Sequence, residues 1–171
     1  DMKGTNRLIL ISYLVTSGMC ISTSVGASEV EVKFISPEKF TDVRLSNKGK
    51  KRSIKTVEKD VQKLFSKLSK DIVNPEQKLV IQVSNIDLPG YMDFMRGDGN
   101  NDIRIIKDMD FYKIEFSYDL FDNPGASLKS GEKKIKGFMN HRPSRLKSNK
   151  FGTVDYFAND IEEWLKSEFS S

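Results

Sequence analysis

Six aspartates surround a glycine-containing stretch in the middle of the chain and are the first candidates for chemistry. They are Asp87, Asp93, Asp98, Asp102, Asp108 and Asp110. Asp98, Asn100 and Asp102 alternate, as oxygen ligands do in calcium loops, where about six to eight oxygens bind the ion. The EF-hand pattern is not met, because Ile103 replaces its glycine and Met109 its final glutamate. We therefore predict no metal site and no cofactor.

A pair of these carboxylates could instead act as the acid and the base of a glycan hydrolase. That chemistry requires two carboxyl groups about 5 to 9 Å apart on the two sides of a cleft. Aspartates at strand ends also accept hydrogen bonds from nearby backbone, and we favour this structural role. The alternative function is a carboxylate-dependent hydrolase or a divalent-metal-binding protein that uses Asp87, Asp98 and Asp102. No catalytic residue is assigned.

Cys20 and His141 are the only cysteine and the only histidine of the chain. A zinc site with several histidines would need more histidines than the chain has, and a serine triad would have to use His141 or another base. Any enzyme built on this sequence would depend on carboxylate, lysine, tyrosine or arginine side chains. Since the sequence shows no coherent catalytic set, a non-enzymatic protein is the leading expectation.

Two short motifs in this part of the sequence each contain one acidic and one basic side chain. They are Asp42 with Arg44 and Asp102 with Arg104. Our hypothesis is that the two motifs pair with each other across the sheet, Asp42 with Arg104 for example.

Three aromatic residues, Tyr91, Phe94 and Phe111, lie in or beside the acidic stretch. Such aromatics either anchor a partner or ligand or tuck under the loop and close the core. The candidate binding residues are Tyr91, Phe94, Asp98, Asp102 and Arg104.

Hydrophobic periodicity predicts the elements that position these residues. Alternation predicts strands at 30–34, 79–86 and 112–120, with a short extended piece at 103–106. The turn signal at 122–125 predicts that residues 127–138 return as a hairpin partner of the strand at 112–120. Apolar residues at steps of three and four predict a helix from Ile54 to Ile72, with Ser53 as its N-cap. A second helix is predicted at 154–169, with Asp160 on its wet side.

The order strand, helix, strand, strand, strand, helix predicts an α+β fold. A mostly antiparallel sheet of three or four strands, with both helices on one face, would bury every apolar stripe. The sequence has no evident internal repeat or interior linker, so residues 28–171 are expected to form a single domain. A chain of this size can bury a sizeable core.

The first 27 residues have the pattern of a secretory signal peptide. Basic residues precede an apolar run from Leu8 to Val15, and small residues lead to Ala27, where we expect cleavage. A retained membrane anchor and a lipoprotein attached at Cys20 are alternatives. Met19 disfavours lipidation, since bacterial lipoprotein signals place a small residue before the cysteine. We expect a periplasmic or secreted protein with no stable membrane span after cleavage.

The chain has a net charge of +4, and its basic residues gather in two clusters. One holds Lys48, Lys50, Lys51, Arg52 and Lys55, and the other holds Arg142, Arg145, Lys147 and Lys150. Such clusters are either a solvated loop and helix start or a surface that attracts anions. Nucleic acid is not expected. The expected partner is an envelope protein or an anionic envelope surface, and the oligomeric state stays open.

Three short motifs resemble a known bacterial family. They are Phe40-Thr41-Asp42-Val43-Arg44, Ile86-Asp87-Leu88 followed by Gly90, and Asp102-Ile103-Arg104-Ile105-Ile106-Lys107-Asp108. With the expected hairpin and a terminal helix that contains Trp164, they make residues 30–165 similar to the domain-of-unknown-function family numbered 3016. Pro89 departs from the small residue expected there. The resemblance implies a small exported protein of one domain, and it supplies no activity and no catalytic residue.

Overall fold

The computed structural model describes residues 29–95, 102–123, 125–139 and 150–169. Its elements are β1 (Glu29–Phe34), η1 (Pro37–Lys39), α1 (Lys50–Ser69), β2 (Lys78–Asp87), β3 (Tyr91–Asp93), β4 (Ile103–Ile105), β5 (Phe111–Phe121), β6 (Ser127–Phe138), η4 (Gly152–Phe157) and α2 (Ala158–Phe169). The segments η1 and η4 are 3-10 helices. The expected signal peptide lies outside the described residues, as do Arg142, Arg145 and Lys147 of the second basic cluster.

Four strands form one sheet in the order β1-β2-β5-β6, and the predicted α+β class is confirmed. β1 and β2 run parallel, because α1 lies between them and returns the chain across the sheet. The pairs β2–β5 and β5–β6 are antiparallel. The sheet is therefore mixed. β3 and β4 form a separate two-stranded sheet, which the alternation pattern did not indicate.

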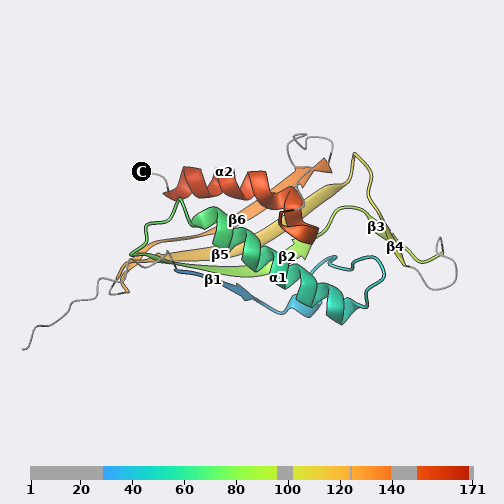
Figure 1. Cartoon of the computed structure of the whole chain (residues 1–171), viewed down its shortest axis with the longest axis horizontal. Coiled ribbons are helices and arrows are strands. Elements are labelled where there is room, and N and C mark those ends of the chain that lie inside the picture. Colours follow the sequence, from blue (N-terminus) through green and yellow to red (C-terminus); the bar gives the residue numbers. More distant parts are fainter. Residues whose placement is uncertain (1–28, 96–101, 124, 140–149, 170–171) are drawn as a thin grey trace, which may run out of the picture.

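Both helices cover the same face of the four-stranded sheet (Figure 1). Side chains alternate along a strand, and the side chains of β5 that face the helices, Tyr112 to Leu120 at every second position, are buried. Phe65 of α1, Phe116 of β5 and Trp164 of α2 meet edge to face, with ring centroids 4.8 to 6.5 Å apart. This geometry suits the charge distribution of aromatic rings. The aromatic contact therefore joins both helices to the sheet.

α1 begins earlier than predicted, and Ser53 is not its N-cap. Gly49 holds that position, while Ser53 lies buried within the first turn. The Ser53 hydroxyl accepts a hydrogen bond from the Leu45 backbone N–H at 3.0 Å and donates one to the Lys48 carbonyl at 3.4 Å. Ser53 thus fastens the preceding loop to the helix. This contact depends on the path of the loop, which the local pattern does not display.

The second predicted helix is α-helical only from Ala158, because residues 152–157 form η4 instead. Asp160 was expected on the wet side, but it is half-buried, and its Oδ2 accepts a hydrogen bond from the Tyr112 hydroxyl at 2.8 Å. The residue is drawn inward because the Tyr112 hydroxyl needs a partner at the edge of the core. Within the described ranges, neither helix is long and apolar enough to cross a bilayer.

The edge strand β6 places two glycines beside tyrosines of β5. Gly131 pairs with Tyr118, and Gly137 pairs with Tyr112. A Cβ atom at Gly131 would lie 2.8 Å from the Tyr118 hydroxyl oxygen, and one at Gly137 would overlap the Tyr112 side chain. Because both glycines lack a side chain, the tyrosines can pass over β6 and reach α2. There the Tyr118 hydroxyl donates to Glu168 at 2.6 Å.

Candidate binding surface

The β3–β4 hairpin projects from one end of the four-stranded sheet (Figure 1). Tyr91 pairs with Ile105, and Asp93 with Ile103. Gly90 leads into β3 with a φ of 86°, and a Cβ atom there would overlap the Ile105 carbonyl. Glycine is therefore required at this turn, since it alone tolerates both the positive φ and the close approach.

Arg104 holds the base of this hairpin. Its side chain is 6% exposed, and it binds the Asp42 carboxylate through Nη1 at 3.2 Å and Nη2 at 2.9 Å. The guanidinium also donates to the carbonyls of Pro89 at 2.7 Å, Leu88 at 2.7 Å and Arg44 at 2.8 Å. A two-point contact between arginine and carboxylate fixes orientation as well as charge. Arg104 therefore joins the hairpin to the loop after β1 and to the end of β2.

Arg44 and Asp102 form a second ion pair beside the first. The Arg44 Nη2 donates to the Asp102 Oδ2 at 2.6 Å. The acidic residue of each motif thus pairs with the arginine of the other motif. The predicted contact of Asp42 with Arg104 is confirmed. It joins a loop to the small hairpin, instead of spanning the main sheet as the hypothesis placed it.

Large apolar side chains are exposed around this hairpin. Of ten such side chains in the described residues, eight lie on the hairpin, in the segment that follows it, or at the adjoining ends of β5 and β6. These eight are Tyr91, Phe94, Met95, Ile103, Ile106, Met109, Phe111 and Phe138. Phe94 is 60% exposed and Met95 is 96% exposed. The eight residues, with Arg44, Lys107 and Lys136, are called the hairpin end below.

Cations lie over aromatic rings within the hairpin end. The Lys136 Nζ lies 4.2 Å from the centroid of the Phe111 ring, and the Lys107 Nζ lies 5.6 Å from that of Tyr91. The Arg44 guanidinium lies 4.9 Å from the centroid of the Phe94 ring. These are cation–π distances. The hairpin end therefore combines exposed apolar area with positive charge.

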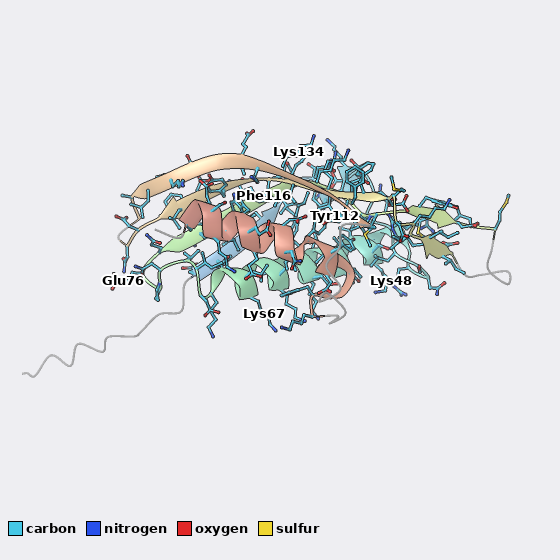
Figure 2. All side chains as sticks on the ribbon, turned by 90° about the horizontal axis from the view of Figure 1, so that it is seen from above. Lys48, Lys67, Glu76, Tyr112, Phe116 and Lys134 are labelled. Carbon is cyan, nitrogen blue, oxygen red and sulfur yellow. The ribbon has the colours of Figure 1, made fainter. Side chains whose placement is uncertain are left out.

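The first basic cluster adjoins the hairpin end. The Asn47 backbone N–H donates to the Asp102 carbonyl at 2.9 Å, so the loop before α1 runs beside β4. α1 then opens with the basic residues 50–52 and has no acidic residue in its first turn. Figure 2 shows Lys48 toward the same end of the molecule as the hairpin, and Glu76 toward the opposite end.

Residues 28–167 match the family described as Protein of unknown function (DUF3016). The chain belongs to this family. No curated protein matches the chain. A minor lipoprotein from Acinetobacter baumannii, known from a 2.35 Å crystal structure, is similar with 9% identity and a TM-score of 0.30, over 82% of this chain and 94% of that chain. A TM-score this low bears on neither the fold nor the function of the DUF3016 chain.

The three motifs that carry the resemblance meet around Arg104 in this DUF3016 chain. Arg104 itself belongs to the third motif. Asp42 and the Arg44 carbonyl come from the first, and the carbonyls of Leu88 and Gly90 come from the second. The residues on which the resemblance rests thus build the joint that supports the hairpin.

Two aspartates of the acidic stretch organise the backbone of the hairpin end. The Asp93 Oδ1 accepts a hydrogen bond from the Met95 N–H at 2.9 Å, and the Asp110 Oδ2 accepts one from the Lys107 N–H at 2.6 Å. Local contacts of this kind are typical of aspartates in turns. Asp98, which was a candidate binding residue, lies outside the described residues.

The other described aspartates of the acidic stretch have separate surroundings. Burial raises the pKa of the Asp87 carboxyl, an effect that the nearby Lys113 ammonium opposes and the Asp42 carboxylate reinforces. Asp102 is held by its pair with Arg44. In the part of the chain that the structure describes, no three acidic, histidine or cysteine side chains gather as metal ligands would. The described residues give no support to the hydrolase or metal-binding alternative.

The structure separates the roles of the candidate binding residues. Tyr91 and Phe94 are exposed, whereas Arg104 is buried and positions the hairpin from within. Sequence periodicity missed Met95 as part of the surface. The sequence does contain a sign that Met95 is exposed. Met95 lies beside Phe94 in a polar loop, and no hydrophobic periodicity places either side chain in the core.

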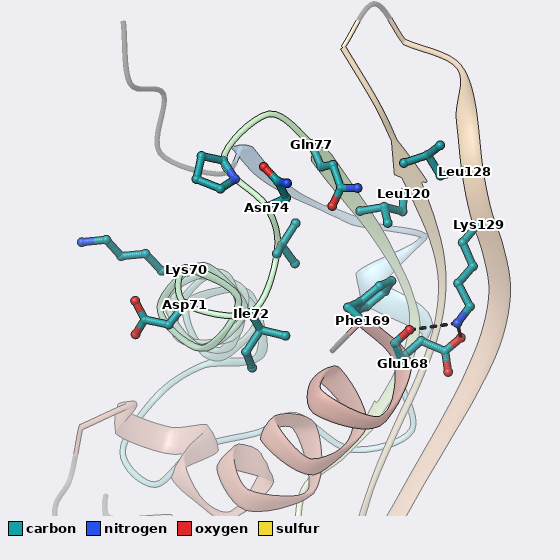
Figure 3. Close-up of a pocket in the computed structure, with 12 residues that line it drawn as sticks. Lys70, Asp71, Ile72, Asn74, Gln77, Leu120, Leu128, Lys129, Glu168 and Phe169 are labelled. Atoms are coloured by element: carbon teal, nitrogen blue, oxygen red, sulfur yellow. Dashed lines mark hydrogen bonds and ion pairs between the residues drawn. The ribbon is translucent and has the colours of Figure 1, made fainter. Parts of the chain in front are cut away.

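A separate cavity of about 850 Å³ lies between the C-terminal ends of the two helices and the turn between β5 and β6, as Figure 3 shows. Its walls include Ile72, Leu120, Leu128 and Phe169. The Lys129 ammonium lies 2.7 Å from Glu168 Oε1 at its edge. Glu168 also accepts a hydrogen bond from the Tyr118 hydroxyl, so the ion pair at the edge of the cavity has a structural role.

Proposed function

We propose that this DUF3016 protein is a non-enzymatic binding module of the cell envelope, and that the hairpin end contacts its partner. The observation that carries the proposal is the gathering at one end of eight of the ten exposed large apolar side chains in the described residues. Scattered apolar residues on a surface need no explanation, whereas a contiguous group commonly marks an interaction site.

The support beneath the surface fits a binding role. The Arg104 contacts hold the base of the hairpin in one orientation relative to Asp42 and the carbonyls around it. A surface that is ordered before it meets a partner loses less conformational entropy on binding. The ion pair of Arg104 with Asp42 therefore fixes the base of the hairpin that carries Phe94 and Met95.

The envelope is proposed as the compartment because of the N-terminal sequence. The apolar run from Leu8 to Val15, preceded by basic residues and followed by small ones, is typical of an export signal. We propose that the protein acts there by binding another envelope component.

A sedimentation experiment tests this proposal. The protein, purified from its host cell as that cell processes it, is mixed with the envelope fraction of the same cells and sedimented. The surface variant Phe94→Ser/Met95→Ser is compared with Ile35→Ser/Leu128→Ser, which alters the two exposed large apolar residues outside the hairpin end.

We expect the hairpin variant to lose co-sedimentation and the control variant to keep it. Thermal melts must show that both variants remain folded, as the exposure of all four side chains predicts. Equal retention of both variants, or equal loss, would contradict the proposal.

A further inference from the structure

We infer that the partner of the hairpin end is the surface of an anionic lipid bilayer. This inference rests on the proposed function and specifies its ligand. It follows from three features of the same end of the molecule, which are the exposed apolar residues, the cations beside them and the basic start of α1. The shape of the projection then favours a bilayer over a folded protein.

The first feature is apolar exposure at the far end of β3. Phe94 and Met95 follow Asp93, the last residue of β3, and are 60% and 96% exposed. The Asp93 contact to the Met95 N–H keeps this backbone turned, with the hydrogen bond at 2.9 Å. An aromatic and an unbranched thioether side chain can both enter the boundary between headgroups and acyl chains, where burial of apolar area drives binding.

The second feature is positive charge at the rim of the apolar residues. Lys107 and Lys136 lie against Tyr91 and Phe111. Their aliphatic stems can lie along apolar surface while the ammonium groups stay at the level of the phosphates. An aromatic ring with a neighbouring cation is suited to the boundary between headgroups and acyl chains. The ring can contact the acyl chains while the cation stays hydrated among the headgroups.

The third feature is the basic start of α1. Residues 50–52 are Lys, Lys and Arg, and the first turn of α1 has no acidic residue. Cations at a helix N-terminus oppose the helix dipole, so this arrangement is unfavourable for the isolated helix. The Asn47 to Asp102 contact, at 2.9 Å, brings the loop before these charges beside the hairpin. Anionic headgroups would relieve the repulsion and attract the whole end of the molecule.

Two of the acidic residues at this end are neutralised by arginines. Asp42 and Asp102 are each engaged by an arginine, at 2.9 and 2.6 Å. Asp93 and Asp110 accept hydrogen bonds from backbone N–H groups of the hairpin end, and their carboxylates offset the charges of Lys107 and Lys136. The net positive charge that an approaching surface meets therefore comes from the start of α1, residues 50–52.

The shape favours a bilayer over a folded protein. The hairpin projects from the sheet (Figure 1), and three cavities in the described part of the chain are lined by residues outside the hairpin end, apart from Lys136. A projection of this kind needs a groove in a protein partner, whereas a fluid bilayer adapts to it.

Vesicle co-sedimentation tests the inference. The protein is again taken as the host cell processes it. The probes are vesicles of phosphatidylglycerol mixed with phosphatidylcholine, and vesicles of phosphatidylcholine alone. We expect binding to the anionic vesicles, a steep loss of binding as salt is added, and weak binding to the neutral ones.

Two variants separate the apolar and the electrostatic contributions. Phe94→Ser/Met95→Ser should weaken binding to the anionic vesicles by at least about tenfold, the effect of one large apolar side chain. Lys50→Gln/Lys51→Gln should weaken binding and reduce its salt dependence, and it leaves the hairpin intact. Ile35→Ser/Leu128→Ser should bind as the unaltered protein does.

The outcomes distinguish this inference from the proposed function. No binding to anionic vesicles, or binding that the hairpin variant retains, would overturn the lipid assignment. If the hairpin variant nevertheless fails to co-sediment with the envelope fraction, the proposed function stands and the partner is a protein or glycan. If neither assay depends on the hairpin end, both proposals fail.

Discussion

The Arg104 guanidinium lies against the Asp42 carboxylate in a two-point contact, with nitrogen–oxygen distances of 3.2 and 2.9 Å. The two residues are 62 positions apart in the chain. Because Arg104 also donates to the carbonyls of Leu88 and Pro89, this one side chain defines how the hairpin leaves the body of the protein. The exposed residues that we propose as the contact surface depend on it for their placement.

Replacing Arg104 should destabilise the protein more than replacing its neighbour Arg44. Arg104→Lys keeps the charge but cannot reproduce the planar two-point contact and the carbonyl contacts, so we expect a loss of about 2–3 kcal/mol in the free energy of unfolding. Arg44→Lys alters a pair whose side chains are 37% and 31% exposed, and should cost less than about 1 kcal/mol. Urea unfolding of both variants measures the difference, and equal losses would contradict the assignment of Arg104 as the support.

The close approach of Gly137 to Tyr112 predicts that Gly137→Ala is destabilising. The added methyl group would overlap the tyrosine side chain, and such overpacking typically costs about 1–3 kcal/mol. Ser130→Ala is the control, since Ser130 is exposed on the same edge strand. Thermal unfolding of the two variants measures the effect. If Gly137→Ala unfolds at the same temperature as the unaltered protein, Tyr112 does not pack over β6 as described.

Tyr118 should ionise at unusually high pH. Burial, together with the hydrogen bond to Glu168, raises the pKa of Tyr118 to about 12. The folded state holds this proton more tightly than the unfolded chain does. The stabilisation is therefore complete below the ordinary tyrosine pKa of about 10 and is lost as the pH rises through about 12.

Ultraviolet titration of phenolate absorbance, with Tyr118→Phe to identify the signal, measures this pKa. Glu168→Gln should lower the pKa of Tyr118 but leave it above the ordinary value, because the contribution of burial remains. A Tyr118 that titrates with the exposed tyrosines would refute the buried contact with α2.

Asp87 should reduce stability at neutral pH. Burial raises the pKa of its carboxyl, so the folded state disfavours the charged form relative to the unfolded chain. The Asp87 carboxyl contributes favourably to the free energy of unfolding when the pH is below the ordinary aspartate pKa. This contribution is lost as the pH rises through the pKa that Asp87 has in the folded state. Asp87→Asn should therefore be the more stable protein at neutral pH and should lose that advantage in acid. Urea unfolding at several pH values tests this, and a variant less stable at every pH would contradict it.

The sequence was a good guide wherever one period persisted over many residues. The alternation around Tyr112 to Leu120 located β5, and residues 127–138 form β6 as predicted. It was a poor guide where a long-range contact decides the structure. The position of Ser53 depends on Leu45 and Lys48, and short strands such as β3 carry too few residues to display a period.

The candidate binding surface was predictable only in part. Tyr91 and Phe94 were candidates because periodicity does not place them in the core, and the structure exposes both. The pairing of Asp42 with Arg104 was anticipated from two matching motifs. The separation of exposed Phe94 from buried Arg104 could not be predicted, since both lie in polar segments. Burial there depends on how three distant motifs fold together around one guanidinium.

Site-specific photocrosslinking in intact host cells tests the central claim most directly. A photoreactive residue that reacts with both proteins and lipids is placed in the full chain at Met95, or at Leu128 as a control of comparable chemistry outside the hairpin end. The adducts are then identified by mass spectrometry. We predict adducts with an envelope component, phospholipid above all, from position 95 and few from position 128. Equal adducts from both positions, or adducts from position 128 alone, would contradict the claim that the hairpin end is the contact surface.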